Sequence, residues 1–419
     1  MAIGKNFTIL FSAMVVGHAL AFILLPVFTW VFTPEMFGVF SYYSYLIAFI
    51  SIPITLGYES QITNSRSDKD GYGLVQLVMW FSLIFGCILL FILWPVYAHL
   101  DGVKYALWLS LLTIFSAVVA NVLTALQFFC VKKQHYKNLA LSNFLNQGGR
   151  SVTQLGSGWL LMSSLGIVGG DIIGRMITVF ILIWQRFSIR KILQIPSRTD
   201  FIAYMRRYRA DSLWYMGSSL MEITIMWFPF LALATLSGIN NGGIAAMTIR
   251  LLFVPSGMVG KALADIYHGY VNNFRWQLTW GNIPLSQLGL LLIFISSFSL
   301  VTIIWVFAHL MNPETLLNLL PETWRSLYSM SLLLIPAVVI QMTAQSFVRY
   351  AVMSGLNSIR FLFYIALAIS LVSLYGYANY TAMQIESILT YYIYLYVGGH
   401  FLYYLILSFS TPKKSFKKI

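Results

Sequence analysis

The sequence predicts an all-α, polytopic membrane protein with about twelve transmembrane helices in two six-helix lobes. Of the 419 residues, 59% are hydrophobic, only 9% are charged, and the mean hydropathy is +0.77. A soluble protein of this length cannot cover its surface with so few charged residues. Apolar stretches of about twenty residues, the length that crosses a bilayer, recur throughout the chain and give the helix count.

Each expected helix is an apolar stretch bounded by short polar connections. The first contains Ala19-Leu20-Ala21, which resembles a signal-peptide cleavage site, but its apolar run continues to Phe32. Since that run is long enough to span, we expect an uncleaved first helix. The expected spans are 7–32, 37–60, 73–98, 105–130, 139–162, 165–187, 212–236, 244–271, 285–309, 327–351, 360–378 and 388–410.

Basic residues set the orientation, because Lys and Arg in short loops stay on the cytoplasmic side. With the amino terminus inside, the cytoplasmic segments hold 19 of the 26 Lys and Arg residues, and the opposite side has only Lys104 and Arg325. Both termini are therefore expected in the cytoplasm. Since these loops account for most of the net charge of +13, we expect contact with membrane lipids and no nucleic-acid partner.

The longest connection divides the chain into two halves of six spans each. It runs from 188 to 210, is the most basic segment, and is expected to lie along the anionic lipid surface. A weak internal repeat supports the division. Pro26 precedes a turn marked by Gly38 in the first half, and Pro229 precedes a turn marked by Gly242 and Gly243 in the second. The expected parts are a first lobe (1–187), a basic cytoplasmic linker (188–210), a second lobe (211–410) and a basic cytoplasmic tail (411–419).

Nine ionisable residues lie within or at the edges of the spans. Burying a charge in the bilayer costs roughly 2.5–3.5 kcal/mol even on the mildest scale, so such residues usually face a wet cavity or a partner. In the eighth span, Arg250 and Lys261 share one helix face with Gly257, and Asp265 extends it. They either bind an anion such as phosphate in a cavity, or Lys261 and Asp265 form an ordinary i,i+4 pair.

Three further basic residues are candidate ligands for an anionic substrate. Arg150 follows two glycines that allow close helix approach, and it either faces a cavity or pairs with a buried carboxylate. Arg175 lies four residues after Asp171, where a self-neutralising ion pair is the favoured interpretation. Arg349 lies near the cytoplasmic end of its span, so its side chain either contacts substrate or extends to the interface.

Carboxylates within the spans are candidates for ion coupling. Glu59 and Glu222 have no basic residue at helical spacing, and an isolated carboxylate in a low dielectric can carry a proton or help to bind Na⁺. The alternative is a salt bridge to an arginine on another helix. Asp171 and Asp265 complete this set of candidates.

Several kinds of chemistry are not indicated by the sequence. It contains no G-x-x-x-x-G-K-[ST] loop for ATP, and no His and Cys cluster for a metal. We expect no metal and no resident cofactor, with Na⁺ or H⁺ as the candidate coupling ion. Cys87 and Cys130 lie in apolar spans, so we expect no disulfide.

Motifs in the first two-thirds of the chain resemble those of one family of membrane proteins. Phe32-Thr33-Pro34-Glu35-Met36-Phe37-Gly38-Val39 is similar to the turn that joins their first two helices, and Tyr58-Glu59 to the end of the second. Gly57 stands where the family pattern has arginine, so no substrate role is carried over for that position. The segments 165–174 and 242–255 resemble the family's sixth and eighth helices.

The family is the Wzx type of O-antigen flippase, in the multidrug/oligosaccharidyl-lipid/polysaccharide (MOP) exporter superfamily. The resemblance implies two lobes around a central cavity, alternating access, and a bacterial inner-membrane location. It also implies an undecaprenyl-pyrophosphate-linked oligosaccharide as substrate, moved from the cytoplasmic to the periplasmic leaflet. A polysaccharide polymerase and a chain-length regulator are the candidate protein partners.

Three other functions remain open from the sequence. One, a lipid II flippase, would share the mechanism and differ in its cargo. A drug or cation antiporter of the same fold would favour a cavity rich in carboxylates, whereas the spans here carry many bases. An O-antigen polymerase or integral glycosyltransferase usually has a large loop for its catalytic residues, and the longest non-cytoplasmic loop here runs only from about 310 to 326. A transporter, not an enzyme, is therefore expected.

Overall fold

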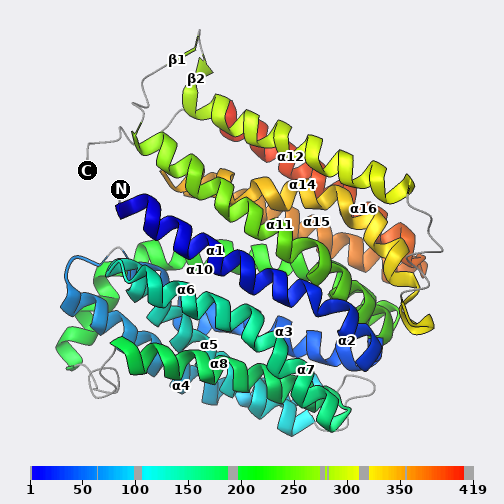
Figure 1. Ribbon diagram of the computed structural model, residues 1–419, viewed down its shortest axis with the longest axis horizontal. Coiled ribbons are helices and arrows are strands. Elements are labelled where there is room, and N and C mark those ends of the chain that lie inside the picture. The colour runs from blue at the N-terminus through cyan, green and yellow to red at the C-terminus, as the bar shows by residue number, and fades with distance from the viewer. Residues whose placement is uncertain are drawn as a thin grey trace. The chain divides into compact units, whose positions relative to one another are not determined.

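The fold is described from a computed structural model, which covers residues 2–63, 65–98, 106–186, 197–273, 279–280, 283–310, 320–353 and 356–409. A helix or a broken helix lies at each of the twelve expected spans (Figure 1). In chain order these are α1 (Ala2–Ile23) with α2 (Leu25–Val31), α3 (Pro34–Thr55), α4 (Asp68–Ala98), α5 (Ala106–Lys132), α6 (Tyr136–Phe144) with α7 (Arg150–Leu161), α8 (Ser164–Arg186), α10 (Arg198–Leu236), α11 (Ile239–Asn273), α12 (Leu285–Leu310), α14 (Ser326–Met353), α15 (Asn357–Thr381) and α16 (Ile385–Phe409).

Short elements complete the described part of the chain. A five-residue π-helical turn, η2 (Leu145–Gly149), joins α6 to α7, and 3₁₀ turns lie at η1 (Tyr58–Gln61) and η3 (Glu322–Trp324). Between α11 and α12, β1 (Thr279–Trp280) pairs antiparallel with β2 (Ile283–Pro284). Apart from this two-residue ladder, the described elements are helical, as the sequence predicts.

Helix length and composition identify a multi-pass membrane protein. Seven of the described helices are long and apolar enough to cross a bilayer. They lie at Pro34–Thr55, Asp68–Ala98, Ala106–Lys132, Ser164–Trp184, Ser212–Leu236, Glu322–Val348 and Ser358–Thr381. Large apolar side chains such as Phe91 (79% exposed) and Trp184 (79% exposed) cover the outer faces, as lipid-facing helices require.

The chain forms two compact units. The first comprises residues 1–224 and 238–243, and the second comprises 225–237 and 244–419. Within the first, α7 packs along α8, α4 along α5, and α1 along α6; within the second, α14 packs against both α12 and α16. The lobe limits expected at 187 and 211 stay a prediction.

Pro26, in the first span, lies at a break between two helices, whereas Pro229, its counterpart in the second half, does not. α1 ends at Ile23 and α2 begins at Leu25, so Pro26 lies in the first turn of α2, where its missing N–H is not needed. Pro229 lies inside α10, which continues through it. The two halves therefore share the position of the proline but not the interruption.

The motif after the first span is a helix start. Thr33 is the N-cap of α3, with its hydroxyl accepting from the Met36 N–H at 3.3 Å. Pro34 occupies the first helical position, and Glu35 adds negative charge near the positive end of the helix dipole. The Thr-Pro-Glu sequence is thus explained by helix capping.

The second half of the expected linker is part of a helix. α10 begins at Arg198 and continues without a break into the seventh span; residues 188–196 lie outside the described part. This segment packs on the first unit, where the Tyr58 hydroxyl donates to the Met205 carbonyl at 3.0 Å and the Phe201 ring meets the Phe81 ring edge-on. Arg207 forms an ion pair with Asp70, with Nη1 and Oδ2 3.1 Å apart.

Two glycines bring the starts of α3 and α11 into backbone contact. A Cβ at Gly38 would lie 2.3 Å from the Ile239 carbonyl oxygen, and a Cβ at Gly243 would lie 1.9 Å from the Pro34 carbonyl oxygen. The glycines in the sequence repeat therefore meet each other. No side-chain rotation can relieve an overlap with backbone atoms.

We predict that Gly243→Ala destabilises the protein by about 1–3 kcal/mol, the usual cost of overpacking. Thermal unfolding of the purified protein in detergent measures this. Gly376→Ala, on an exposed part of α15 where a Cβ meets nothing within 4 Å, is the matched control and should unfold at or above the parent temperature. Equal stability of the Gly243→Ala protein and the parent would show that this contact is not a constraint.

Candidate functional site

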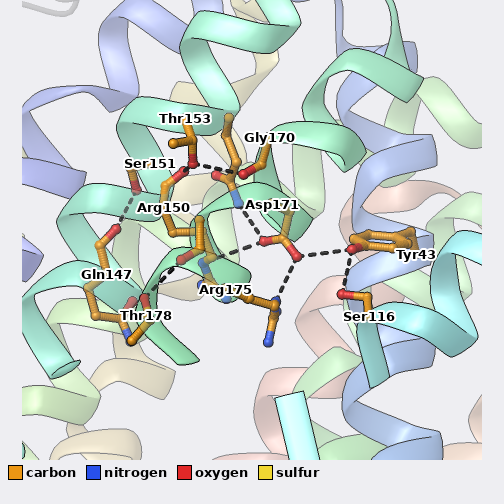
Figure 2. Close-up of polar contacts among 12 residues, drawn as sticks. Tyr43, Ser116, Gln147, Arg150, Ser151, Thr153, Gly170, Asp171, Arg175 and Thr178 are labelled. Atoms are coloured by element: carbon orange, nitrogen blue, oxygen red, sulfur yellow. Dashed lines mark hydrogen bonds and ion pairs between the residues drawn. The ribbon is translucent and has the colours of Figure 1, made fainter. Parts of the chain in front are cut away.

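Within the first unit, four helices bring polar side chains together around one carboxylate. Asp171 of α8 lies at the centre, with Arg150 of α7 on one side and Tyr43 of α3 on the other (Figure 2). Gln154 of α7 donates a hydrogen bond to the carboxylate. The Asp171 side chain is 2% exposed. We call Tyr43, Arg150, Gln154, Asp171 and Arg175 the Asp171 cluster.

Small residues on α8 make this cluster possible. Gly170 and Gly174 lie against α7, and a Cβ on either would come within 3 Å of α7 atoms, namely the Thr153 carbonyl oxygen and the Arg150 Cα. Such a small-residue stripe lets two helix backbones approach closely in a membrane. The Thr153 hydroxyl then donates to the Gly170 carbonyl at 2.7 Å, which fixes the register of the two helices.

Asp171 accepts from donors on three helices. Its Oδ1 lies 2.7 Å from Gln154 Nε2 and 3.4 Å from Arg150 Nε. Its Oδ2 lies 2.8 Å from Arg175 Nε and accepts from the Tyr43 hydroxyl at 3.0 Å. Both carboxylate oxygens are thus used, as a buried charge requires. The i,i+4 ion pair that the spacing of Asp171 and Arg175 predicts is present.

The position of Arg150 depends on the π-helical turn before it. η2 ends at Gly149, and Arg150 begins α7. Gly148 faces α1, where a Cβ would lie 3.1 Å from the Gly17 carbonyl oxygen. Gly148 does allow close helix approach, as expected, whereas a Cβ at Gly149 would meet only Leu145 of its own turn, at 3.5 Å.

The cluster carries more positive than negative charge. Two guanidinium groups share one carboxylate, and within the described residues Asp171 is the carboxylate in ion-pair contact with either arginine. Each arginine forms its ion pair with Asp171 through Nε, and the side chains of Arg150 and Arg175 remain 21% and 13% exposed. An anion is the ligand that would balance the remaining positive charge.

Two other predicted site residues lie on other helices. Arg250 lies in α11 in the second unit, and Glu222 lies in α10. Lys261, Asp265 and Arg349 are on helices, but their side chains are outside the described part. Gly257, on the expected cationic face of α11, lies near α14, since a Cβ there would be 3.4 Å from Gln341 Nε2.

Glu59 forms a separate buried site just beyond α3. It lies in η1, is 5% exposed, and accepts from the Thr55 hydroxyl at 2.5 Å. Burial raises the pKa of Glu59 to about 7, and the hydrogen bond from Thr55 opposes this rise. The preceding Gly57 has φ +73°, and a Cβ there would lie 2.6 Å from the Ser212 carbonyl oxygen. A larger residue at position 57 would therefore be strained and would overlap the Ser212 backbone.

Two members of the cluster are missing from the sequence-based set. Gln154 lies four residues after Arg150, so helical spacing places both on one face and could have identified it. Tyr43 is one of 25 tyrosines, and nothing in its neighbourhood marks it. Its hydroxyl also lies 2.7 Å from Ser116 Oγ of α5, which links a fourth helix to the cluster.

Comparison with known proteins shows the family to which the chain belongs. Residues 3–264, which contain the whole cluster, match the family model described as polysaccharide biosynthesis protein. The chain belongs to this family. No curated protein sequence matches the chain significantly.

Solved structures with a similar fold are transporters. A MATE protein in complex with MaL6 has a TM-score of 0.60 and 14% identity, covering 96% of this chain and 95% of that chain. A MOP superfamily transporter from Pyrococcus furiosus, described with a binding pocket of reverse polarity, has a TM-score of 0.57 and 12% identity over 96% and 94% of the two chains. An inward-facing multidrug resistance MATE family transporter has a TM-score of 0.53 and 16% identity over 95% and 92%.

These likenesses establish the fold of this family member. The fold resembles that of these MATE and MOP superfamily proteins, which confirms the helical architecture that the sequence predicts. The family model connects the chain with polysaccharide biosynthesis, and the solved structures show how it folds. At these identities the structures do not specify what is transported.

We predict that Asp171→Asn destabilises the protein by about 3–5 kcal/mol, because it leaves two buried arginines without their counter-charge. Tyr43→Phe, which removes one hydrogen bond to the carboxylate, should cost less, about 1.5–3 kcal/mol. Denaturant unfolding of the purified variants gives both values. If Asp171→Asn lowers the free energy of unfolding no more than Tyr43→Phe does, Asp171 is not the shared counter-charge of the two arginines.

The raised pKa of Glu59 predicts a pH dependence of stability. Between its ordinary pKa of 4.5 and about 7, the folded protein holds a proton that the unfolded chain has lost. The contribution of this group to stability therefore falls as pH rises through that range and is constant above it. The melting temperature of the parent minus that of Glu59→Gln should decrease from pH 5 to pH 7.5. A constant difference would show that Glu59 is ionised throughout.

Proposed function

We propose that the protein is a flippase for undecaprenyl-pyrophosphate-linked oligosaccharide repeat units. It moves them from the cytoplasmic to the periplasmic leaflet of the bacterial inner membrane by alternating access, with both termini in the cytoplasm. A polymerase that joins repeat units, with its chain-length regulator, would use the product. The family supports the connection to polysaccharides, and the Asp171 cluster supports the anionic headgroup.

The observation that carries this proposal is the unequal charge of the cluster. One carboxylate neutralises one of two guanidinium groups, Arg150 and Arg175, within an apolar helix bundle. A pyrophosphate has the charge and the oxygen geometry that guanidinium groups bind best. Arg250, Lys261 and Arg349 in the second unit are further candidate ligands for the same headgroup or its sugars.

The energy source is proposed to be an ion gradient. Glu59 is a buried carboxylate whose pKa of about 7 allows it to gain and lose a proton near neutral pH. Glu222, Asp171 and Asp265 remain candidates for the same role, with Na⁺ as the alternative ion. Of these, Asp171 is the least suited to carrying a coupling ion, because its carboxylate is already paired with two arginines.

A drug or cation antiporter is the second candidate, because the similar solved structures include multidrug transporters. A cation needs a surplus of negative charge where it binds. The Asp171 cluster has the opposite sign, which favours an anionic substrate.

Deletion of the gene, with complementation by variants, tests the proposal. Surface glycan should disappear while single lipid-linked repeat units accumulate on the cytoplasmic leaflet, since translocation is the step that is lost. Arg175→Gln should restore less than about a tenth of the parent's surface glycan, the effect of losing one charge-assisted contact of about 1.4 kcal/mol or more. Arg206→Gln, a change at an exposed arginine of α10, is the matched control and should complement fully.

Three outcomes would contradict the proposal. Full complementation by Arg175→Gln, expressed at the parent's level, would exclude the cluster from substrate binding. Single repeat units that still reach the surface while long chains vanish would indicate a polymerase. Unchanged glycan with increased sensitivity to cationic drugs would indicate the antiporter.

A further inference from the structure

A cavity of about 520 Å³ lies within the second unit, between α12, α14 and α16. Its volume is within the range of small-molecule sites, about 300–1,000 Å³. Val301 and Ile340 form its floor, and they are 3% and 1% exposed. Phe298 and Phe401 also line it and are 56% and 50% exposed, so the cavity opens at the side of these helices.

The chemistry of the lining excludes a polar ligand. The side chains around the cavity are apolar except for Thr302, whose hydroxyl donates to the Phe298 carbonyl of its own helix at 2.8 Å. A sugar or phosphate would therefore lose its hydrogen bonds to water and find none here. Cavities of this kind stay dry and accept apolar guests.

The depth of the cavity agrees with a hydrocarbon ligand. Phe298 on α12 and Gly398 on α16 each lie thirteen residues after the first residue of their helix, or about 20 Å at 1.5 Å per residue. Both positions are near the middle of segments that the sequence predicts to cross the bilayer, 285–309 and 388–410. At that depth only hydrocarbon chains are present in a membrane.

The cavity is open because residue 398 is glycine. A Cβ there would meet nothing within 4 Å, so the sequence leaves room at this point that any other residue would reduce. Glycine in the interior of a helix is unfavourable relative to alanine. Gly398 lines the cavity, whereas Gly376, which has the same free space around it, is not among the lining residues.

We propose that this cavity binds part of the polyisoprenoid chain of the lipid-linked substrate. The rings of Phe298 and Phe401 and the gap at Gly398 give an uneven apolar surface, which suits a methyl-branched chain better than a straight acyl chain. The choice of this chain rests on the proposed function, whereas the presence of an apolar ligand does not. Holding the chain here would retain the lipid while the headgroup crosses.

Binding of radiolabelled undecaprenol, an uncharged polyisoprenoid, to the purified full-length protein in detergent tests the inference. A leucine side chain at 398 would occupy room for several carbons of the chain, and losing contact with two methylenes already weakens binding about tenfold. Gly398→Leu should therefore bind undecaprenol at least tenfold more weakly, and Gly398→Ala should show a smaller loss. Gly376→Leu, at another exposed helical glycine with nothing within 4 Å, should bind as the parent does.

Two results would overturn the inference. One is binding to Gly398→Leu and Gly398→Ala at the parent's affinity. The other is equal competition by dioleoylglycerol, which would show a site for acyl chains in general.

The proposed function is tested separately by undecaprenyl phosphate. If the parent binds it no more tightly than undecaprenol, and Arg175→Gln changes nothing, the headgroup site fails while the undecaprenol result still decides the cavity. If undecaprenyl phosphate instead binds more tightly than undecaprenol, in a way that depends on Arg175 but not on Gly398, the result would support the flippase and show that the cavity has no part in its mechanism.

Discussion

The sharing of one buried carboxylate by two arginines is the interaction on which the candidate site depends. Asp171 contacts both Arg150 and Arg175, and it also accepts hydrogen bonds from Gln154 and Tyr43. In a low dielectric an unpaired charge is very costly, so the carboxylate holds α3, α7 and α8 in fixed positions. Because it is one charge against two, the same arrangement is the basis of the proposed anion site.

The architecture could be predicted from the sequence because it follows from local properties. Apolar length gave the twelve helical segments, and the i,i+4 spacing gave the Asp171–Arg175 pair. The glycines before Arg150 predicted close helix approach, and Gly148 does lie against α1. Each of these rests on the residues of one helix and on the solvent around it.

What could not be predicted depends on which helices meet. Nothing local brings Tyr43 to a carboxylate 128 residues away, and no propensity rule places a π-helical turn at 145–149, before Arg150. The start of α10 at Arg198, within the expected linker, follows from packing of Phe201 and Tyr204 against the first unit. The apolar cavity is likewise formed by three helices, and residue spacing gives no sign of it.

The most direct test of the account is the charge selectivity of translocation by purified protein in liposomes. The substrate is a fluorescent lipid-linked oligosaccharide with a pyrophosphate, compared with the same lipid and sugars joined by an uncharged linkage. We predict that the parent moves the pyrophosphate form much faster and that the double variant Arg150→Gln, Arg175→Gln loses this preference. Equal selectivity in the parent and the double variant would contradict the role assigned to the Asp171 cluster.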